Sequence, residues 1–147
     1  MKKINKKHPF IFISLFILSV LVSCKKNDDQ PNVNTATQVS AAVSSGSWKV
    51  TYFLDHDTDE TSDFGGYAFT FAASGTVTAT KGSSTVTGDW SAGNDDSKVK
   101  LVLDFDDALF EELAEDWELI KATATHIELM HKSGGDGHID YLTFEKI

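Results

Sequence analysis

One stretch of the sequence decides the fold class: residues 46–55, which read Gly-Ser-Trp-Lys-Val-Thr-Tyr-Phe-Leu-Asp. The pattern has a period of two, which is typical of an antiparallel strand with one buried face. The residues predicted to face inward are Trp48, Val50, Tyr52 and Leu54, and they alternate with Lys49, Thr51, Phe53 and Asp55. The segment is therefore predicted to be the first strand of a half-buried sheet.

The same period recurs along the rest of the chain, interrupted by residues that favour turns. Further strands are predicted at residues 67–73, 77–79, 85–90, 99–105, 116–123, 125–132 and 139–147, with turns at 65–66, 74–75, 82–84, 92–96 and 133–137. One segment, residues 106–114, has a helical composition, with Leu109 and Leu113 four positions apart. The sequence thus predicts an all-β, eight-stranded antiparallel up-and-down barrel with one short helix between strands five and six.

A family resemblance supports the barrel. Gly46-Ser47-Trp48 resembles the G-x-W signature of lipocalins. It is followed by a pattern of strand-like segments at residues 69–75, 88–90, 116–119 and 127–129. Together these segments are similar to the small lipocalin-like (calycin-type) domains of Bacteroidota lipoproteins. The resemblance covers about residues 46–147 and implies a short barrel of calycin type.

The N-terminal segment predicts export and lipidation. Lysines at positions 2, 3, 6 and 7 precede an apolar run from Phe10 to Val22, which is too short for a confident membrane span. Residues 21–24, Leu-Val-Ser-Cys, resemble the bacterial lipobox. We expect residues 1–23 to be a removed signal peptide, Cys24 to carry the lipid, including palmitate, and residues 24–45 to be a flexible tether.

This organisation also predicts a location and a charge. The acylated Cys24 would anchor the protein in the lipid bilayer of the outer membrane, on its periplasmic or cell-surface face. All 22 acidic residues follow Cys24 and four of the 13 lysines precede it, so the mature chain has a formal charge of −13. The chain contains no arginine. Such a surface repels phosphate backbones, and nucleic acid is therefore excluded as an expected partner.

The predicted barrel interior offers a first candidate site. An eight-stranded barrel is either filled by its own side chains or holds one small ligand. The expected inward aromatic residues, which would line an apolar pocket, are Trp48, Tyr52, Phe69, Phe71, Trp90 and Phe105. The alternative is that these rings fill the interior themselves and serve as core.

The acidic segment after the first strand offers a second candidate. Asp55, Asp57 and Asp59 alternate as in the first half of a calcium loop, but the glycine and the final bidentate glutamate of that loop are not matched. His131 and His138 flank the last hairpin at a spacing that is not typical of zinc ligands. Solvated polar loops are the simpler interpretation of both, so no metal and no cofactor is predicted.

The sequence matches no catalytic motif that names a nucleophile, a base and an orienting group, so an enzyme is not predicted. Two non-enzymatic functions remain open. The barrel binds a small apolar ligand or a glycan fragment, or it is a protein-interaction module, such as an accessory subunit or inhibitor. The second would use the acidic rim and loops of the barrel to meet an envelope protein.

The lipobox assignment leads to a direct test. Because the lipid is attached through the cysteine sulfur, Cys24→Ala is expected to yield an unlipidated precursor that keeps its leader. Metabolic labelling with an alkyne fatty acid, followed by a gel-mobility assay, measures both outcomes. Normal acyl labelling of the variant would contradict the assignment.

Overall fold

The period-two segments form strands in the computed structural model, which describes residues 33–135 and 137–147. The predicted leader, residues 1–23, and Cys24 lie outside the described residues. The strands are β1 (Ser47–Asp55), β2 (Thr58–Asp59), β3 (Ala68–Phe71), β4 (Thr76–Lys81), β5 (Ser84–Asp95), β6 (Lys98–Asp104), β7 (Asp116–Ala122), β8 (His126–Lys132) and β9 (Ile139–Lys146).

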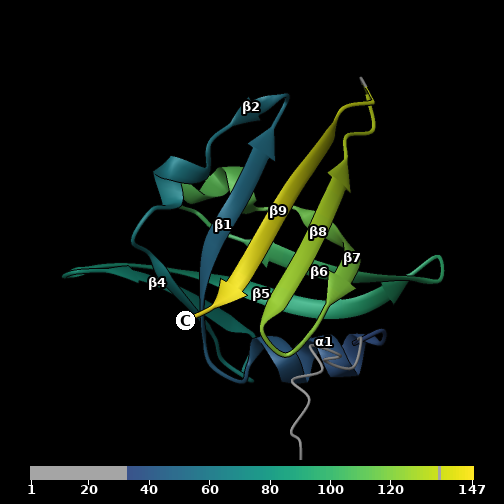
Figure 1. Ribbon diagram of the computed structural model, residues 1–147, viewed down its shortest axis with the longest axis horizontal. Helices are drawn as coiled ribbons and strands as arrows, with labels where there is room; N and C mark the ends of the chain where they lie inside the picture. The colour runs from purple at the N-terminus through teal and green to yellow at the C-terminus, as the bar shows by residue number, and fades with distance from the viewer. Residues whose placement is uncertain (1–32, 136) are drawn as a thin grey trace, which may run out of the picture.

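Pairing between the first and last long strands closes the sheet into a barrel (Figure 1). Each strand pairs with its neighbours in an antiparallel sense, and β1 pairs with β9 along most of its length, from Trp48 to Leu54. The two-residue β2 pairs only with the end of β1, so eight strands form the wall in the described part of the chain. The prediction of an all-β, eight-stranded antiparallel barrel is confirmed.

A β-bulge in β1 corrects one of the predicted orientations. The register between β1 and β9 shifts between Val50 and Tyr52, so one extra residue lies on β1. Beyond this point the alternation is reversed: Phe53 is fully buried, and Tyr52 is 39% exposed on the outer surface. The prediction that Tyr52 points into the barrel was therefore wrong, because a period-two pattern does not reveal a bulge.

A helix closes one end of the barrel and corrects the predicted tether. The helix α1 (Ala36–Val43) begins at Thr35, whose side chain and that of Gln38 form a capping box. It packs across β5 and β6, and its residues Val39 and Val43 are fully buried. Residues 36–43 therefore belong to the folded domain, and the prediction of a flexible tether extending to residue 45 was wrong for this part.

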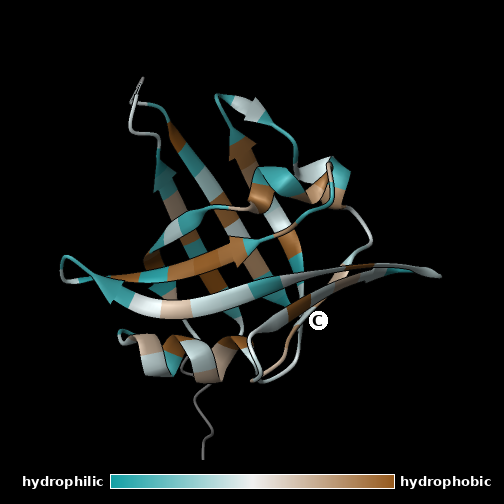
Figure 2. Ribbon diagram, turned by 180° about the vertical axis from the view of Figure 1, so that it is seen from behind, coloured by the Kyte–Doolittle hydropathy of each residue, from teal (hydrophilic) through white to brown (hydrophobic). Residues whose placement is uncertain are grey.

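Two short 3₁₀ helices cover the opposite end. The helix η1 (Thr61–Phe64) follows β2, and η2 (Phe110–Leu113) lies between β6 and β7, which are the fifth and sixth strands of the barrel wall. The predicted short helix is thus confirmed in place, although it is a single 3₁₀ turn. Figure 2 shows α1 below the strands and the two short helices toward the opposite end. Among the described residues, no helix is both long and apolar enough to cross a membrane.

Gly88 in β5 allows the chain at the end of β6 to lie close against β5. A Cβ atom on Gly88 would overlap the carbonyl oxygen of Asp104 and would lie 2.6 Å from Cδ1 of Phe105. In contrast, a Cβ atom on Gly93, in the same strand, would meet no atom within 4 Å. The sheet can therefore hold Phe105 against β5 only while residue 88 has no side chain.

This difference gives a matched pair of variants. Gly88→Ala is expected to lower the free energy of unfolding by about 1–3 kcal/mol, because Phe105 and the β6 backbone must shift. Gly93→Ala is expected to change it by less than about 0.5 kcal/mol. Urea denaturation measures both, and equal destabilisation by the two substitutions would contradict this account of the Gly88 contact.

Candidate functional site

The barrel interior is filled by side chains that were predicted to line an apolar pocket. Five of these six residues are buried and belong to one continuous core, and the sixth, Tyr52, lies outside. The buried five are Trp48, Phe69, Phe71, Trp90 and Phe105. Their burial favours the interpretation in which these rings act as core.

The rings pack edge to face at distances typical of aromatic pairs in protein cores. The ring centroids of Phe71 and Trp90 lie 5.6 Å apart, and those of Phe69 and Phe144 lie 5.3 Å apart. Phe110 of η2 lies 5.2 Å from Phe105, so the turn that covers the barrel end contributes its own ring to the core. Side chains of the wall and of the end caps thus share the interior.

All three tryptophans donate their indole N–H groups to main-chain carbonyls. Trp48 Nε1 donates to Val43 O at the end of α1, 2.8 Å away, and Trp117 Nε1 donates to Leu113 O at the end of η2, 3.0 Å away. Trp90 Nε1 donates to Ala72 O beside β3 at 2.9 Å. A buried indole N–H needs such a partner, so the bonds of Trp48 and Trp117 hold the two end caps against the barrel.

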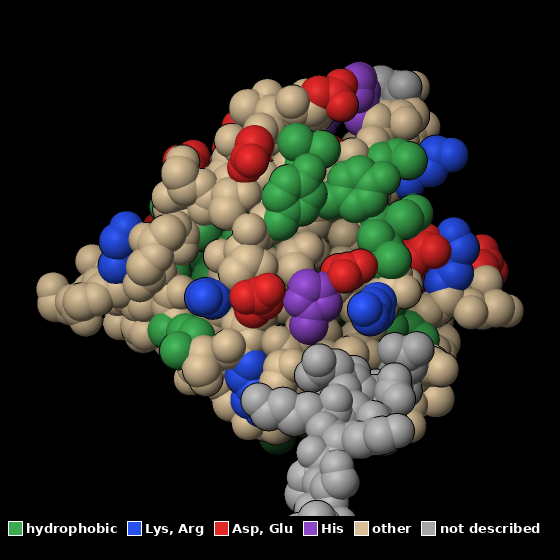
Figure 3. Space-filling view, viewed as in Figure 1, with side chains coloured by type: hydrophobic (Ala, Val, Ile, Leu, Met, Phe, Trp, Pro, Cys, Tyr) green, Lys and Arg blue, Asp and Glu red, His purple; other side chains and the backbone are tan. Residues whose placement is uncertain are grey.

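The end covered by η1 and η2 carries a dense group of acidic residues, which we call the acidic end. It consists of residues 55–63 and 106–116, which hold five and six carboxylates respectively, half of the 22 in the chain, and no lysine. The rings of Phe64 and Phe110, 5.5 Å apart, hold the two segments together. Figure 3 shows acidic and histidine side chains together at the top of the molecule.

Two carboxylates at the acidic end influence each other electrostatically. Partial removal from water, a hydrogen bond with Glu60, and the negative charges of Glu60, Asp55 and Asp63 raise the pKa of Glu112 to about 6. The Oε2 atom of Glu60 is itself buried without a hydrogen-bond donor from the described residues. These neighbours favour the protonated form of Glu112 in the folded state.

The three aspartates considered for calcium do not converge on one point. Asp59 accepts a hydrogen bond of 3.0 Å from the Thr61 backbone, and hydrogen bonding by the Thr61 side chain and then by this backbone N–H lowers the pKa of Asp59. Asp57 faces His138, with 3.7 Å between Oδ2 and Nδ1. Asp55 contacts His56, and the calcium-loop pattern therefore does not correspond to a calcium-binding geometry in the fold.

A different group, which we call the His56 cluster, comprises Asp55, His56 and Asp140. His56 Nδ1 lies 2.7 Å from Asp55 Oδ1 and 3.9 Å from Asp140 Oδ1. One ligand atom from each residue lies within 4.8 Å of the others. The end of β1 and the start of β9 bring these residues together across 84 positions of the sequence, so no local motif reveals the cluster.

Asp140 is the unusual member of this cluster. Among the described residues it is the single charged or polar residue that is buried, with 8% of its side chain exposed. Its Oδ1 accepts a hydrogen bond of 3.0 Å from the His56 backbone N–H. The second imidazole of this end, His138, lies beside the cluster, with its ring centroid 5.3 Å from that of His56.

The structure separates the two histidines that flank the last hairpin. His131 faces Glu115 and Asp116, at 3.6 Å and 3.1 Å, whereas His138 faces His56. The carboxylates beside His131 are about half exposed, at 45% and 55% of their side chains. The two histidines therefore belong to different groups at the acidic end.

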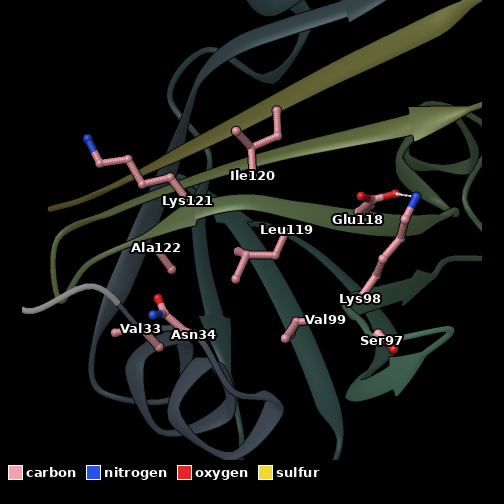
Figure 4. A pocket seen from close by; sticks show the side chains of 10 residues that line it. All are labelled: Val33, Asn34, Ser97, Lys98, Val99, Glu118, Leu119, Ile120, Lys121 and Ala122. Carbon is pink, nitrogen blue, oxygen red and sulfur yellow. Dashed lines mark hydrogen bonds and ion pairs between the residues drawn. The ribbon is translucent and has the colours of Figure 1, made fainter.

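A surface groove of about 300 Å³ lies where β6 and β7 diverge (Figure 4). The strands pair only between residues 100–102 and 116–118, and Val33 covers part of the gap by donating its N–H to Ala122 O. The groove combines aliphatic side chains with the Lys98–Glu118 ion pair of 2.7 Å. Two of its charged side chains are thus already paired with each other.

Comparisons with known proteins give limited information. No family model matches the chain, and no curated protein matches it significantly. Among solved structures, the chain is similar to a DUF4847 family protein from Bacteroides vulgatus, with 20% sequence identity and a TM-score of 0.49. The match covers 73% of this chain and 96% of that one. A likeness at this level assigns neither family nor function.

The Glu60–Glu112 pair predicts a pH dependence of stability. Because the pKa of Glu112 is raised above its ordinary value of 4.5 in the folded state, the native chain binds the proton more tightly than the unfolded chain. The contribution of this proton to stability is complete below pH 4.5 and is lost as the pH rises through about 6. Glu112→Gln is therefore expected to stabilise the protein at pH 7 and to lose that advantage near pH 4.

Thermal unfolding of the wild type and the variant between pH 4 and pH 7.5 measures this effect. Glu111→Gln is the matched control, because it removes a neighbouring charge without changing the Glu60–Glu112 pair. If both variants shifted the unfolding temperature equally at every pH, the raised pKa of Glu112 would not be the cause.

Proposed function

We propose that this protein is a lipid-anchored, non-enzymatic interaction module whose acidic end binds a cationic segment of an envelope protein. The observation that carries the proposal is the combination of a filled barrel with eleven carboxylates, and no lysine, in the two segments that cover one end. A concentrated surface charge accelerates and orients the binding of a partner with the opposite charge.

The packing supports a surface function over binding inside the barrel. A ligand of drug size needs a cavity of roughly 300–1,000 Å³ lined by apolar groups. The interior side chains instead contact one another, and α1 packs over one end while η1 and η2 pack over the other. A ligand could enter only after the core rings had moved apart.

The remaining parts of the proposal rest on the sequence. Anchoring through acylated Cys24, in the outer membrane, is supported by the lipobox-like residues 21–24. A relationship to the small lipocalin-like domains of Bacteroidota lipoproteins is supported by Gly46-Ser47-Trp48 and by the closed, sequentially ordered barrel. The anchor would leave the folded domain at the membrane surface, where an acidic end can meet other envelope proteins.

Site-specific photo-crosslinking in cells tests the proposal. A benzoylphenylalanine would be placed at Thr58 or Glu111, both exposed at the acidic end, and at Ser83 in the β4–β5 turn as a control. We expect one discrete protein adduct from the first two positions, joined to a Lys- or Arg-rich peptide of the partner, and none from Ser83.

Charge dependence provides the second half of this test. The adduct is expected to disappear when Asp57 and Asp59 are both replaced by lysine, and to weaken in salt of about 0.5 M, since exposed charges are screened there. The proposal would be overturned by adducts of equal strength at Ser83, or by adducts that persist after charge reversal. It would also be overturned by a small ligand that co-purifies with the protein while no crosslink forms.

A further inference from the structure

We propose that the His56 cluster is a binding site for a divalent first-row transition-metal ion, and that zinc is the ion its donors fit best. The ligands are carboxylate oxygens of Asp55 and Asp140 and a ring nitrogen of His56. Metal binding would be a property of the chain alone, so this inference does not depend on the proposed interaction with a partner.

The chemistry of the donors selects the class of ion. Calcium and magnesium take oxygen ligands almost exclusively, whereas zinc accepts imidazole nitrogen and carboxylate oxygen together. The site has one such nitrogen and two carboxylates, which is a three-residue set of the kind that leaves one position open. Sites of this kind are often completed by water or by a fourth side chain.

The spacing of the ligand atoms fits a tetrahedral ion after small side-chain movements. Bonds of about 2.0–2.1 Å to zinc place neighbouring ligands roughly 3.3 Å apart. The present separations from His56 Nδ1 are 2.7 Å to Asp55 and 3.9 Å to Asp140, one below and one above this value. The side chain of His56 is 53% exposed, so it has room to adjust.

The buried charge of Asp140 provides an independent reason for a cation here. A carboxylate removed from water is costly unless an opposite charge or several hydrogen bonds compensate it. Among the described residues, the ion pairs of Asp140 come from His56 alone, and the imidazole carries a charge only when it is protonated. A divalent ion bound by both side chains would supply that compensation.

Metal binding at this site would replace a hydrogen bond. The 2.7 Å contact between His56 Nδ1 and Asp55 Oδ1 is a hydrogen-bond distance, and Nδ1 can ligate only in the tautomer that carries its hydrogen on Nε2. The ring of His138, 5.3 Å from that of His56, is the described side chain best placed to become a fourth ligand.

The neighbouring group of Glu115, Asp116 and His131 also brings three ligand atoms within 4.8 Å. Its two carboxylates are well solvated, at 45% and 55% exposure, so neither needs a cation for compensation. The buried carboxylate distinguishes the His56 cluster from this group, and the experiment must separate the two.

Zinc titration of the full-length protein, purified in detergent and stripped with a chelator, tests the inference. Calorimetry at pH 7.5 is expected to give one zinc ion per chain. Cobalt, used as a coloured substitute, is expected to give the intense visible absorption of tetrahedral coordination. His56→Gln and Asp140→Asn are each expected to weaken zinc binding by at least about 10-fold.

His126→Gln and His131→Gln are the controls and are expected to bind zinc as the wild type does. His126 contacts Glu128 at 2.7 Å and lies away from the cluster, and His131 belongs to the competing group. If Asp140→Asn lowers stability, His56→Gln carries the test, because its side chain is largely exposed. The inference is overturned if the wild type binds no zinc, or if His131→Gln abolishes binding while His56→Gln does not.

Discussion

The hydrogen bond from the buried indole of Trp48 to α1 is the interaction on which the rest of the structure depends. Its N–H group lies inside the core and must find an acceptor there, and the acceptor is the last carbonyl of α1. Trp117 repeats this arrangement with η2 at the opposite end. The two bonds make the end caps part of the core, and a barrel closed at both ends cannot offer its interior as easily as an open one. The interior rings are thereby committed to packing, and the outer surface remains accessible.

Half of the carboxylates in the chain are gathered at the acidic end of that surface, and repulsion between like charges there lowers stability. Eleven carboxylates lie in two short segments, and the pKa of Glu112 is raised by partial burial first and by neighbouring carboxylates second. A surface without a functional role would be expected to have such charges spread apart, because like charges in contact weaken the folded state. The arrangement is most simply explained if a cation, from a partner or from solution, is present for part of the time.

The sequence predicted the barrel and its strand order because alternation along a strand is a local property. The positions of the turns were harder to predict. Residues 92–96 were expected to form one, but β5 continues through Gly93, and the reversal occurs at Asp96 and Ser97, both with positive φ. Asp and Ser both occur in turns, but Gly93 and Asn94 earlier in the segment are stronger turn signals, so the predicted turn began too early. The bulge that exposes Tyr52 and the packing of α1 depend on contacts with distant strands. For the same reason the His56 cluster joins residues 84 positions apart, and no spacing along the chain could indicate it.

The two proposed binding events occupy the same end of the barrel, so each must influence the other. An ion with two positive charges beside Asp55 and Asp140 would reduce the negative potential that attracts a cationic partner. Coupling between the two binding events is reciprocal, so a partner that binds through charge alone must also weaken the affinity for metal. A partner that donates a side chain to the open coordination position would do the opposite and strengthen it. The sign of this coupling therefore distinguishes a purely electrostatic interface from one that is built around the ion.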